Sequence, residues 1–145
     1  MTSHYALSAE RRDQLQRLLE RLGVPVKDLS LLDEAATHKS FGSEHGVRDY
    51  ERLEFFGDAV LKFLIAEYVF LKFDDKHEGE LTEICSVLVS AKTLGLVGRT
   101  FGLGEFIRRG RGVPVKPSTI ARSMEAILGA LYLDSKFEHA RKLIE

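Results

Sequence analysis

The spacing of apolar residues is helical along almost the whole chain. Leucines recur at three- and four-residue intervals over 15–22, and similar stripes run through 51–73, 81–101 and 120–131. These intervals place apolar side chains on one face of an α-helix. No segment shows the strict alternation of a half-buried strand, and the chain contains no internal repeat. The sequence therefore predicts an all-α domain.

Capping residues set the expected boundaries of these helices. Ser8 is a suitable N-cap for the first helix and Gly23 a suitable end, because glycine tolerates the left-handed backbone that closes many helices. Ser118, directly after Pro117, is the expected N-cap of a late helix. Further helices are expected over 29–37, from residue 51 to about 73, over 81–102 and from about residue 135. The polar, glycine-containing stretches 41–48, 74–79 and 104–116 are predicted to be loops.

Length and composition indicate one soluble domain over residues 1–145. The sequence has 44% hydrophobic and 30% charged residues, and a chain of this size is able to bury roughly two thirds of its unfolded surface. Cys85 is the only cysteine, so an intrachain disulfide and a thiol zinc cage are excluded. We expect a cytoplasmic protein without a membrane partner, because the sequence shows neither a signal-peptide pattern nor an uninterrupted membrane-spanning stretch.

Basic residues gather late in the chain, although the formal net charge is only −1. Between residues 107 and 124 no acidic residue interrupts a basic run made up of Arg108, Arg109, Arg111, Lys116 and Arg122. Such a run forms either a solvated loop or a surface for the phosphate backbone of a nucleic acid. Both interpretations remain open at this point.

Three carboxylates share one face of the acidic helix, the predicted helix that begins at residue 51. At about 100° per residue, Glu51, Glu54 and Asp58 fall within roughly 60° of one another. Like charges at these spacings repel, so their assembly on an otherwise apolar helix requires a cation to offset them. Carboxylate oxygens are the ligands that Mg²⁺ and Mn²⁺ prefer. A divalent metal site is therefore the leading interpretation of this face.

A glycine in the acidic helix predicts how a further carboxylate joins the site. Gly57 costs roughly 1 kcal/mol relative to alanine within a helix, which suggests a close crossing with another helix. The late helix carries small residues at positions 121, 129 and 130, which permit such an approach. Glu125 lies on the same strip as these small residues. The crossing would deliver it to Glu54 and Asp58.

The remaining faces of the acidic helix carry separate expectations. The face opposite the carboxylates is predicted to pack into the core through Leu53, Phe56, Val60, Leu64 and Tyr68. Phe55 lies about 40° from Glu51, on the carboxylate side, so something else must cover it. The cover is either a neighbouring helix of the same chain or, if Phe55 is a protruding knob, a second copy of the chain.

Several separated motifs closely resemble those of the ribonuclease III nuclease domain. The run Glu-Arg-Leu-Glu-Phe-Phe-Gly-Asp at 51–58 is similar to the family's signature, and Thr-His-Lys-Ser-Phe at 37–41 is similar to the motif before it. Segments 79–82, 103–105 and 125–134 follow in the family's order, so the resemblance covers nearly the whole chain. A di-iron carboxylate bundle, the rival metal protein, needs Glu-x-x-His pairs that this sequence lacks.

The resemblance implies a homodimeric, all-helical domain with a valley that holds double-stranded RNA. Glu54, Asp58 and Glu125 would bind Mg²⁺, or Mn²⁺ in its place. Asp58 and Glu125 would be the catalytic residues as each subunit hydrolyses one strand of an RNA precursor. The residues expected to contact the RNA are Glu51, Arg108, Arg109, Arg111 and Lys116. Phe55 would insert into a pocket of the partner. No double-stranded-RNA-binding domain is expected in residues 1–145, so RNA affinity should be weak and fall steeply with salt.

The chain departs from the family pattern at Arg122. The family's Asp-x-x-Glu pair would place an aspartate three residues before Glu125, and an arginine there adds positive charge and weakens metal binding. Arg122 either points away from the site, pairs with Glu125 or Asp58 in place of the metal, or binds the scissile phosphate. The second functional hypothesis is accordingly a catalytically degenerate relative that binds structured RNA or serves as a dimeric scaffold.

Overall fold

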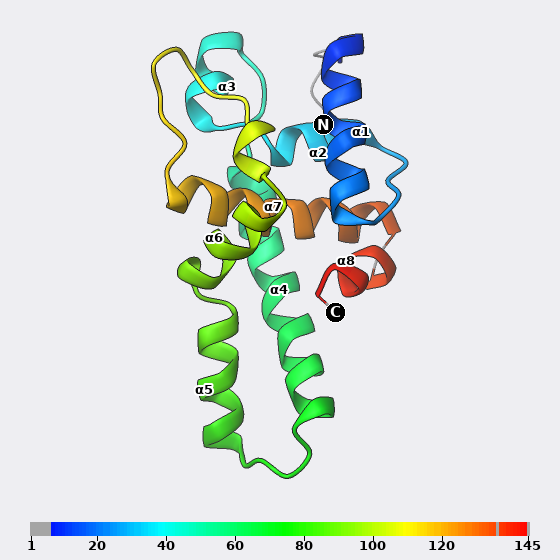
Figure 1. The fold of residues 1–145 in the computed structure, drawn as a ribbon, viewed down its shortest axis with the longest axis vertical. Coiled ribbons are helices and arrows are strands. Elements are labelled where there is room, and N and C mark those ends of the chain that lie inside the picture. Colours follow the sequence, from blue (N-terminus) through cyan, green and yellow to red (C-terminus); the bar gives the residue numbers. More distant parts are fainter. Residues whose placement is uncertain (1–6, 136, 145) are drawn as a thin grey trace.

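The computed structural model describes residues 7–135 and 137–144, and its regular structure is helical (Figure 1). Within those residues there is no β-strand, only an isolated bridge between Thr37 and Arg108. The prediction of an all-α domain is therefore confirmed. In chain order the elements are α1 (Ala9–Leu22), α2 (Leu29–Ala35), α3 (Lys39–His45), α4 (Glu51–Lys72), α5 (Glu78–Leu88), α6 (Ala91–Thr100), the short 3₁₀ helix η1 (Leu103–Glu105), α7 (Pro117–Ser135) and α8 (Phe137–Ile144).

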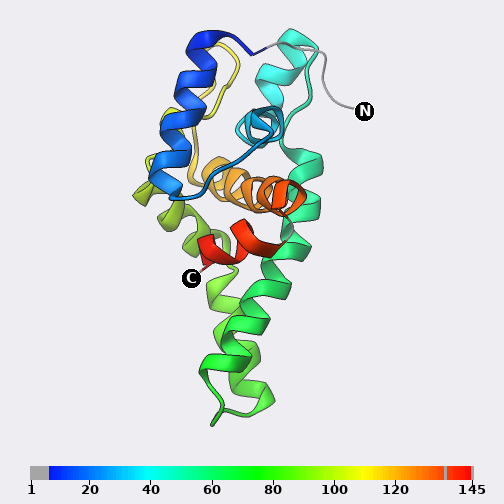
Figure 2. The same cartoon turned by 90° about the vertical axis from the view of Figure 1, so that its right-hand side faces the viewer.

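Helix α7 lies at the centre of the fold, where it crosses α4 (Figure 1, Figure 2). Helices α2, α6 and α8 also pack against α7, so it is covered on most sides. From Thr119 to Leu131, every residue of α7 is buried except Arg122 and Glu125. These two polar side chains mark where the central helix reaches the surface.

Helix α4 supplies a broad apolar face to the core and continues beyond it. The predicted core face is confirmed, because its members are either buried or packed against the core: Leu53, Val60 and Leu64 are buried, and Phe56 and Tyr68 are partly buried. The second half of α4 and helix α5 form a hairpin that projects away from α1 and α2 (Figure 2). In the described residues, no single helix is long and apolar enough to cross a membrane, although α5 and α6 together, bent by 49°, pass that test of length and composition.

Capping interactions explain where the early helices begin and end. Ser8 accepts a hydrogen bond from a first-turn backbone N–H at 3.0 Å, and Gly23 closes α1 in the left-handed conformation with φ 74°, as predicted. The prediction of a loop over 41–48 is wrong, because most of that stretch belongs to α3. His38 begins α3 by accepting a hydrogen bond from the Ser40 N–H at 3.0 Å. A histidine N-cap is not one of the usual capping residues, so composition alone did not reveal this helix.

The helical pattern over 81–102 is interrupted between α5 and α6. Ser90 accepts a hydrogen bond from the Thr93 N–H at 3.2 Å and so caps a new helix where apolar spacing predicted a continuation. Helix α7 begins at Pro117, which makes Ser118 its second residue and not its N-cap. Proline suits the first helical position because its fixed φ is helical and its missing N–H would have no partner there.

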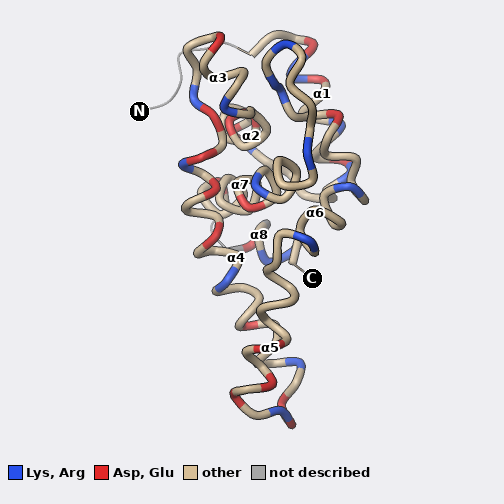
Figure 3. The backbone as a smooth tube through the Cα atoms, turned by 90° about the vertical axis from the view of Figure 1, so that its left-hand side faces the viewer, with Lys and Arg blue, Asp and Glu red and all other residues tan. Residues whose placement is uncertain are grey.

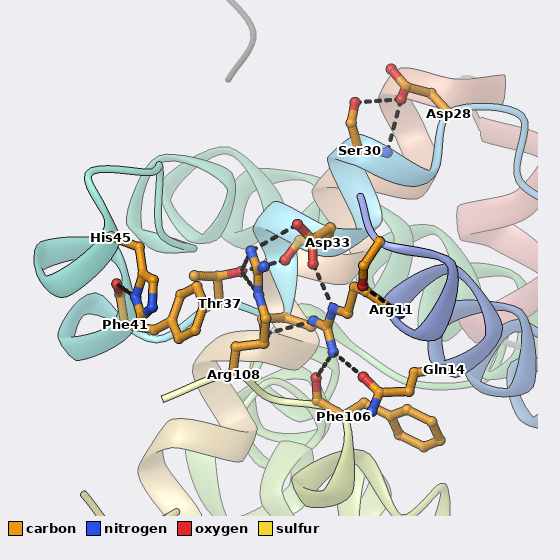
Figure 4. Close-up of polar contacts among 12 residues, drawn as sticks. Arg11, Gln14, Asp28, Ser30, Asp33, Thr37, Phe41, His45, Phe106 and Arg108 are labelled. Carbon is orange, nitrogen blue, oxygen red and sulfur yellow. Dashed lines mark hydrogen bonds and ion pairs between the residues drawn. The ribbon is translucent and has the colours of Figure 1, made fainter. Parts of the chain in front are cut away.

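A buried carboxylate joins two arginines between α1, α2 and the segment that precedes α7 (Figure 4). Asp33 accepts a hydrogen bond from Arg11 Nε at 2.6 Å and another from Arg108 Nη2 at 2.7 Å. Arg11 also donates to the Phe106 carbonyl at 2.7 Å, and the Arg108 guanidinium lies 4.3 Å from the centre of the Phe41 ring. Arg108, which is predicted to contact RNA, thus has a side chain that is only 13% exposed and that pairs with Asp33 inside the fold.

Candidate active site

Two glycines allow α4 and α7 to cross in direct backbone contact. A Cβ on Gly57 would lie 1.7 Å from the Glu125 carbonyl oxygen, and a Cβ on Gly129 would lie 2.8 Å from the Leu53 carbonyl oxygen. Such separations overlap the atoms, so neither position accepts a larger residue unless a helix moves. The close crossing predicted from Gly57 is confirmed, and it brings Glu125 to the acidic face of α4.

Glu54, Asp58 and Glu125 form a carboxylate cluster at this crossing. Burial, followed by the negative charges of Asp58 and Glu54, raises the pKa of Glu125 to about 7. Burial also raises the pKa of Glu54, against the opposing effect of the Arg122 cation. Partly desolvated carboxylates of like charge favour one another's protonated forms. An added cation would relieve this repulsion.

Two cationic side chains form ion pairs with carboxylates of the cluster. Arg122 Nε lies 3.6 Å from Glu54 Oε2, and Lys62 Nζ lies 3.0 Å from Asp58 Oδ2. One of the three predictions for Arg122 is an ion pair with Glu125 or Asp58. Arg122 does form an ion pair with a carboxylate, but its partner is Glu54. Lys62 is not among the predicted site residues. The signal that could have found it is its i, i+4 spacing from Asp58, which brings two helical side chains together.

The cluster suits Mg²⁺ in the kind of its donors but not in their arrangement. Carboxylate oxygens are the hard ligands that this ion prefers. Within residues 7–135 and 137–144, however, no group of three or more His, Cys, Asp or Glu side chains is placed to hold a metal ion. Glu54 and Asp58 each face a cation of the chain. A metal ion bound here would therefore compete with Arg122 and Lys62 for these carboxylates.

The other residues predicted to contact RNA lie on the surface of the molecule. Glu51 is exposed at the start of α4, where its Oε1 lies 3.9 Å from Lys39 Nζ. Acidic positions recur along the half of α4 that α7 crosses (Figure 3). Three members of the basic run are exposed on the loop that leads into α7, namely Arg109, Arg111 and Lys116. The basic loop and the acidic helix face are thus both open to solvent.

Phe55 protrudes from α4 beside a pocket. It is 83% exposed, so no neighbouring helix in the described part of the chain covers it, and that interpretation is wrong. Next to it lies a pocket of about 830 Å³, whose apolar lining includes Leu31, Phe56 and Leu133. A knob and a pocket on one surface permit a twofold contact in which each copy fills the other's pocket.

Two solved structures with a similar fold come from a ribonuclease III and a Dicer. The nuclease domain of ribonuclease III from Campylobacter jejuni is similar to this chain with a TM-score of 0.82 and 37% identity, covering 90% of this chain and 92% of that one. Dicer from Pichia stipitis is similar with a TM-score of 0.66 and 26% identity, covering 83% of this chain and 55% of that one. The chain has the fold of a ribonuclease III nuclease domain.

The sequence comparisons agree with the fold. Residues 28–145 match the family described as Ribonuclease-III-like, and the chain belongs to this family. Ribonuclease 3 of Hahella chejuensis is 42% identical over an alignment that covers 86% of this chain and 56% of that protein. Ribonuclease 3 of Treponema pallidum is 38% identical over an alignment that covers 98% of this chain and 59% of that protein. The chain thus spans little more than half the length of these relatives.

Proposed function

We propose that this chain is the nuclease part of an endoribonuclease that hydrolyses phosphodiester bonds in double-stranded RNA. The observation that carries the proposal is the position of Glu125, which the glycine crossing delivers to Glu54 and Asp58 from a distant part of the chain. The relatives named Ribonuclease 3 and the similarity to the Campylobacter jejuni nuclease domain support it. The proposed setting is RNA processing in the cytoplasm.

The proposed cofactor is Mg²⁺, with Mn²⁺ as a substitute, and Glu54, Asp58 and Glu125 would hold it. Such an ion, when bound, would lower the pKa of a water molecule and offset negative charge on the phosphate. The chain contributes the rigid α4–α7 crossing, which fixes the three carboxylates relative to one another. Asp58 and Glu125 are the proposed catalytic residues. Arg122 and Lys62 pair with Glu54 and Asp58, and a bound divalent ion would compete with these two pairs.

The proposed assembly is a twofold homodimer. The Campylobacter jejuni structure concerns a region involved in dimer formation of that nuclease domain. In this chain the exposed Phe55 borders the pocket of about 830 Å³, so Phe55 of one copy is able to enter the pocket of the other. A dimer also supplies two carboxylate clusters, one for each strand of a duplex.

A second function is favoured by the two ion pairs at the cluster. Arg122 and Lys62 offset the charges of Glu54 and Asp58 without a metal ion. A chain that keeps these pairs would bind structured RNA without hydrolysing it, or would serve as a dimeric scaffold. Arg109, Arg111 and Lys116 are the proposed RNA contacts in either case, and those contacts would weaken with salt.

Incubation of the purified chain with a perfectly paired RNA of about 30 base pairs separates the two functions. The nuclease proposal expects staggered cleavage with Mg²⁺ or Mn²⁺, none with chelator, and none by the Glu125→Gln variant. Binding without cleavage under every condition would support the second function. The exposed Glu20→Gln substitution on α1 is the matched control and should leave cleavage unchanged. Absence of both binding and cleavage contradicts the nuclease proposal and the RNA-binding form of the second function, and leaves only the dimeric scaffold.

A further inference from the structure

A second pocket lies directly beside the carboxylate cluster and shares Arg122 with it. Its volume is about 360 Å³. It lies between His38, the N-cap of α3, the basic loop that leads into α7 and the first turn of α7. The side chains that matter for its chemistry are those of His38, Tyr50, Lys116, Ser118, Thr119 and Arg122. We call it the Lys116 pocket.

The charge of the Lys116 pocket is positive. Lys116 and Arg122 are cations that line it, and no aspartate or glutamate is among its lining residues. In the described part of the chain Lys116 forms no ion pair, whereas Arg122 pairs with Glu54 at 3.6 Å through a side chain that is 56% exposed. The Lys116 charge is therefore fully available to a ligand, and the Arg122 charge is shared with the cluster.

The backbone of α7 adds hydrogen-bond donors to the same pocket. Ser118 and Thr119 are the second and third residues of this 19-residue helix, and both line the pocket. N–H groups of a first helical turn have no acceptor within their own helix. The buried Tyr50 closes the pocket on the α4 side. Cations together with N–H and hydroxyl donors are the groups that recognise phosphate.

We propose that the Lys116 pocket binds one phosphate of the RNA backbone next to the carboxylate cluster, with Lys116 and Arg122 as its cations. This inference rests on the proposed function, since it names where that site holds its substrate. Arg122 pairs with Glu54 and also lines the pocket, so its guanidinium is able to leave the Glu54 carboxylate and bind the phosphate. A guanidinium binds either anion with paired N–H donors. The arginine that replaces the expected aspartate thus acquires a substrate-binding role.

Binding of duplex RNA in chelator, measured at several salt concentrations, tests the proposal without cleavage. Each phosphate contact adds about one unit to the slope of log affinity against log salt concentration. We expect Lys116→Ala to weaken binding roughly three- to tenfold at about 0.1 M salt and to lower that slope by about one. Lys116→Arg should restore both values. Lys27→Ala, at the opposite end of α7 where the Lys27 N–H meets Asp134, is the matched control and should change neither.

The outcomes separate this inference from the proposed function. If the wild-type chain binds duplex RNA and Lys116→Ala binds it with the same affinity and slope, the pocket is overturned while the proposed function stands. If the wild-type chain binds no duplex RNA, the proposed function and the RNA role of the pocket both fail. Thermal unfolding in inorganic phosphate, against chloride of equal ionic strength, then shows whether the pocket takes free phosphate. If phosphate stabilises the wild-type chain but not Lys116→Ala, free phosphate is the ligand of the pocket. If it stabilises both equally, or neither, the pocket is not a phosphate site.

Discussion

The backbone carbonyl of Glu125 occupies the space that a side chain at Gly57 would need, since a Cβ there would lie 1.7 Å from the carbonyl oxygen. This contact joins α4 to α7 at the place where the carboxylate cluster forms. The position of Glu125 relative to Glu54 and Asp58 therefore depends on residue 57 being a glycine. The same contact explains why a glycine, unfavourable within a helix, is found in α4.

Substitution Gly57→Ala should push the two helices apart. We expect a loss of about 1–3 kcal/mol or more in the free energy of unfolding, because overpacking against backbone cannot be relieved by a rotamer change. Urea unfolding measures it. The control is Gly79→Ala in α5, where a Cβ meets nothing within 4 Å and alanine should stabilise the helix slightly. Equal stability of Gly57→Ala and the wild-type chain would contradict the tight crossing.

Substitution Arg122→Asp should turn the cluster into a divalent cation site. Without metal we expect the variant to be less stable than the wild-type chain, because it loses the pair with Glu54 and adds a negative charge. Mg²⁺ or Mn²⁺ should then stabilise it by about 2–3 kcal/mol once the ion is near a hundredfold excess over its dissociation constant. Thermal unfolding with and without metal measures both effects. Arg99→Asp, an exposed change of the same charge on α6, controls for screening, and equal metal responses of the two variants would show that Arg122 does not exclude the ion.

The raised pKa of Glu125 predicts how stability depends on pH. Its pKa rises from an ordinary 4.5 to about 7, so between these values the folded chain keeps a proton that the unfolded chain has released. The unfolded state then binds fewer protons, and the free energy of unfolding falls as pH rises from about 4.5 to about 7. Glu125→Gln should flatten this fall and be more stable than the wild-type chain at about pH 8 without divalent metal. Urea unfolding across pH measures this, and Glu20→Gln should keep the wild-type profile.

Apolar spacing and one glycine predicted most of what positions the carboxylate cluster. The core face of α4 follows from helical periodicity, and the meeting of Glu125 with Glu54 and Asp58 follows from Gly57. Both features depend on residue spacing within one helix or on one helix crossing, so they can be predicted from a single sequence. The family match over residues 28–145 includes these positions.

The partners of individual charges could not be predicted in the same way. Arg108 and Lys116 belong to one basic run, yet Arg108 pairs with the buried Asp33 and Lys116 is exposed in a pocket. The difference depends on which carboxylate the fold brings near, and Asp33 is 75 residues from Arg108 in the sequence. The partner of Arg122 depends likewise on how α7 is rotated against α4. The spacing of residues along the sequence does not predict this rotation.

Removal of the buried carboxylate should be costly because it strands two arginines. Asp33→Ala leaves Arg11, which is 6% exposed, and Arg108 without their shared partner, and we expect a loss of about 3–5 kcal/mol in the free energy of unfolding. Glu105→Ala is the control, because it breaks an exposed pair with Arg21 at 3.4 Å and should cost about 0–1 kcal/mol. Similar losses for the two variants in urea unfolding would contradict a structural role for the Asp33 network.

Phe55→Ala should weaken self-association without weakening the fold of the single chain. Phe55 is 83% exposed, so its removal costs little core packing, but in the proposed dimer it fills the partner's pocket as a central aromatic anchor. Such an anchor contributes about 2 kcal/mol or more. Because a twofold dimer of the variant loses two of them, about 4 kcal/mol in all, we expect the dimer dissociation constant to rise roughly a thousandfold. Sedimentation equilibrium measures that constant. Phe70→Ala is the matched control, since Phe70 is 67% exposed on the same helix and does not line the pocket. An unchanged dissociation constant in Phe55→Ala removes the knob role, and a wild-type chain that stays monomeric at high concentration contradicts the homodimer itself.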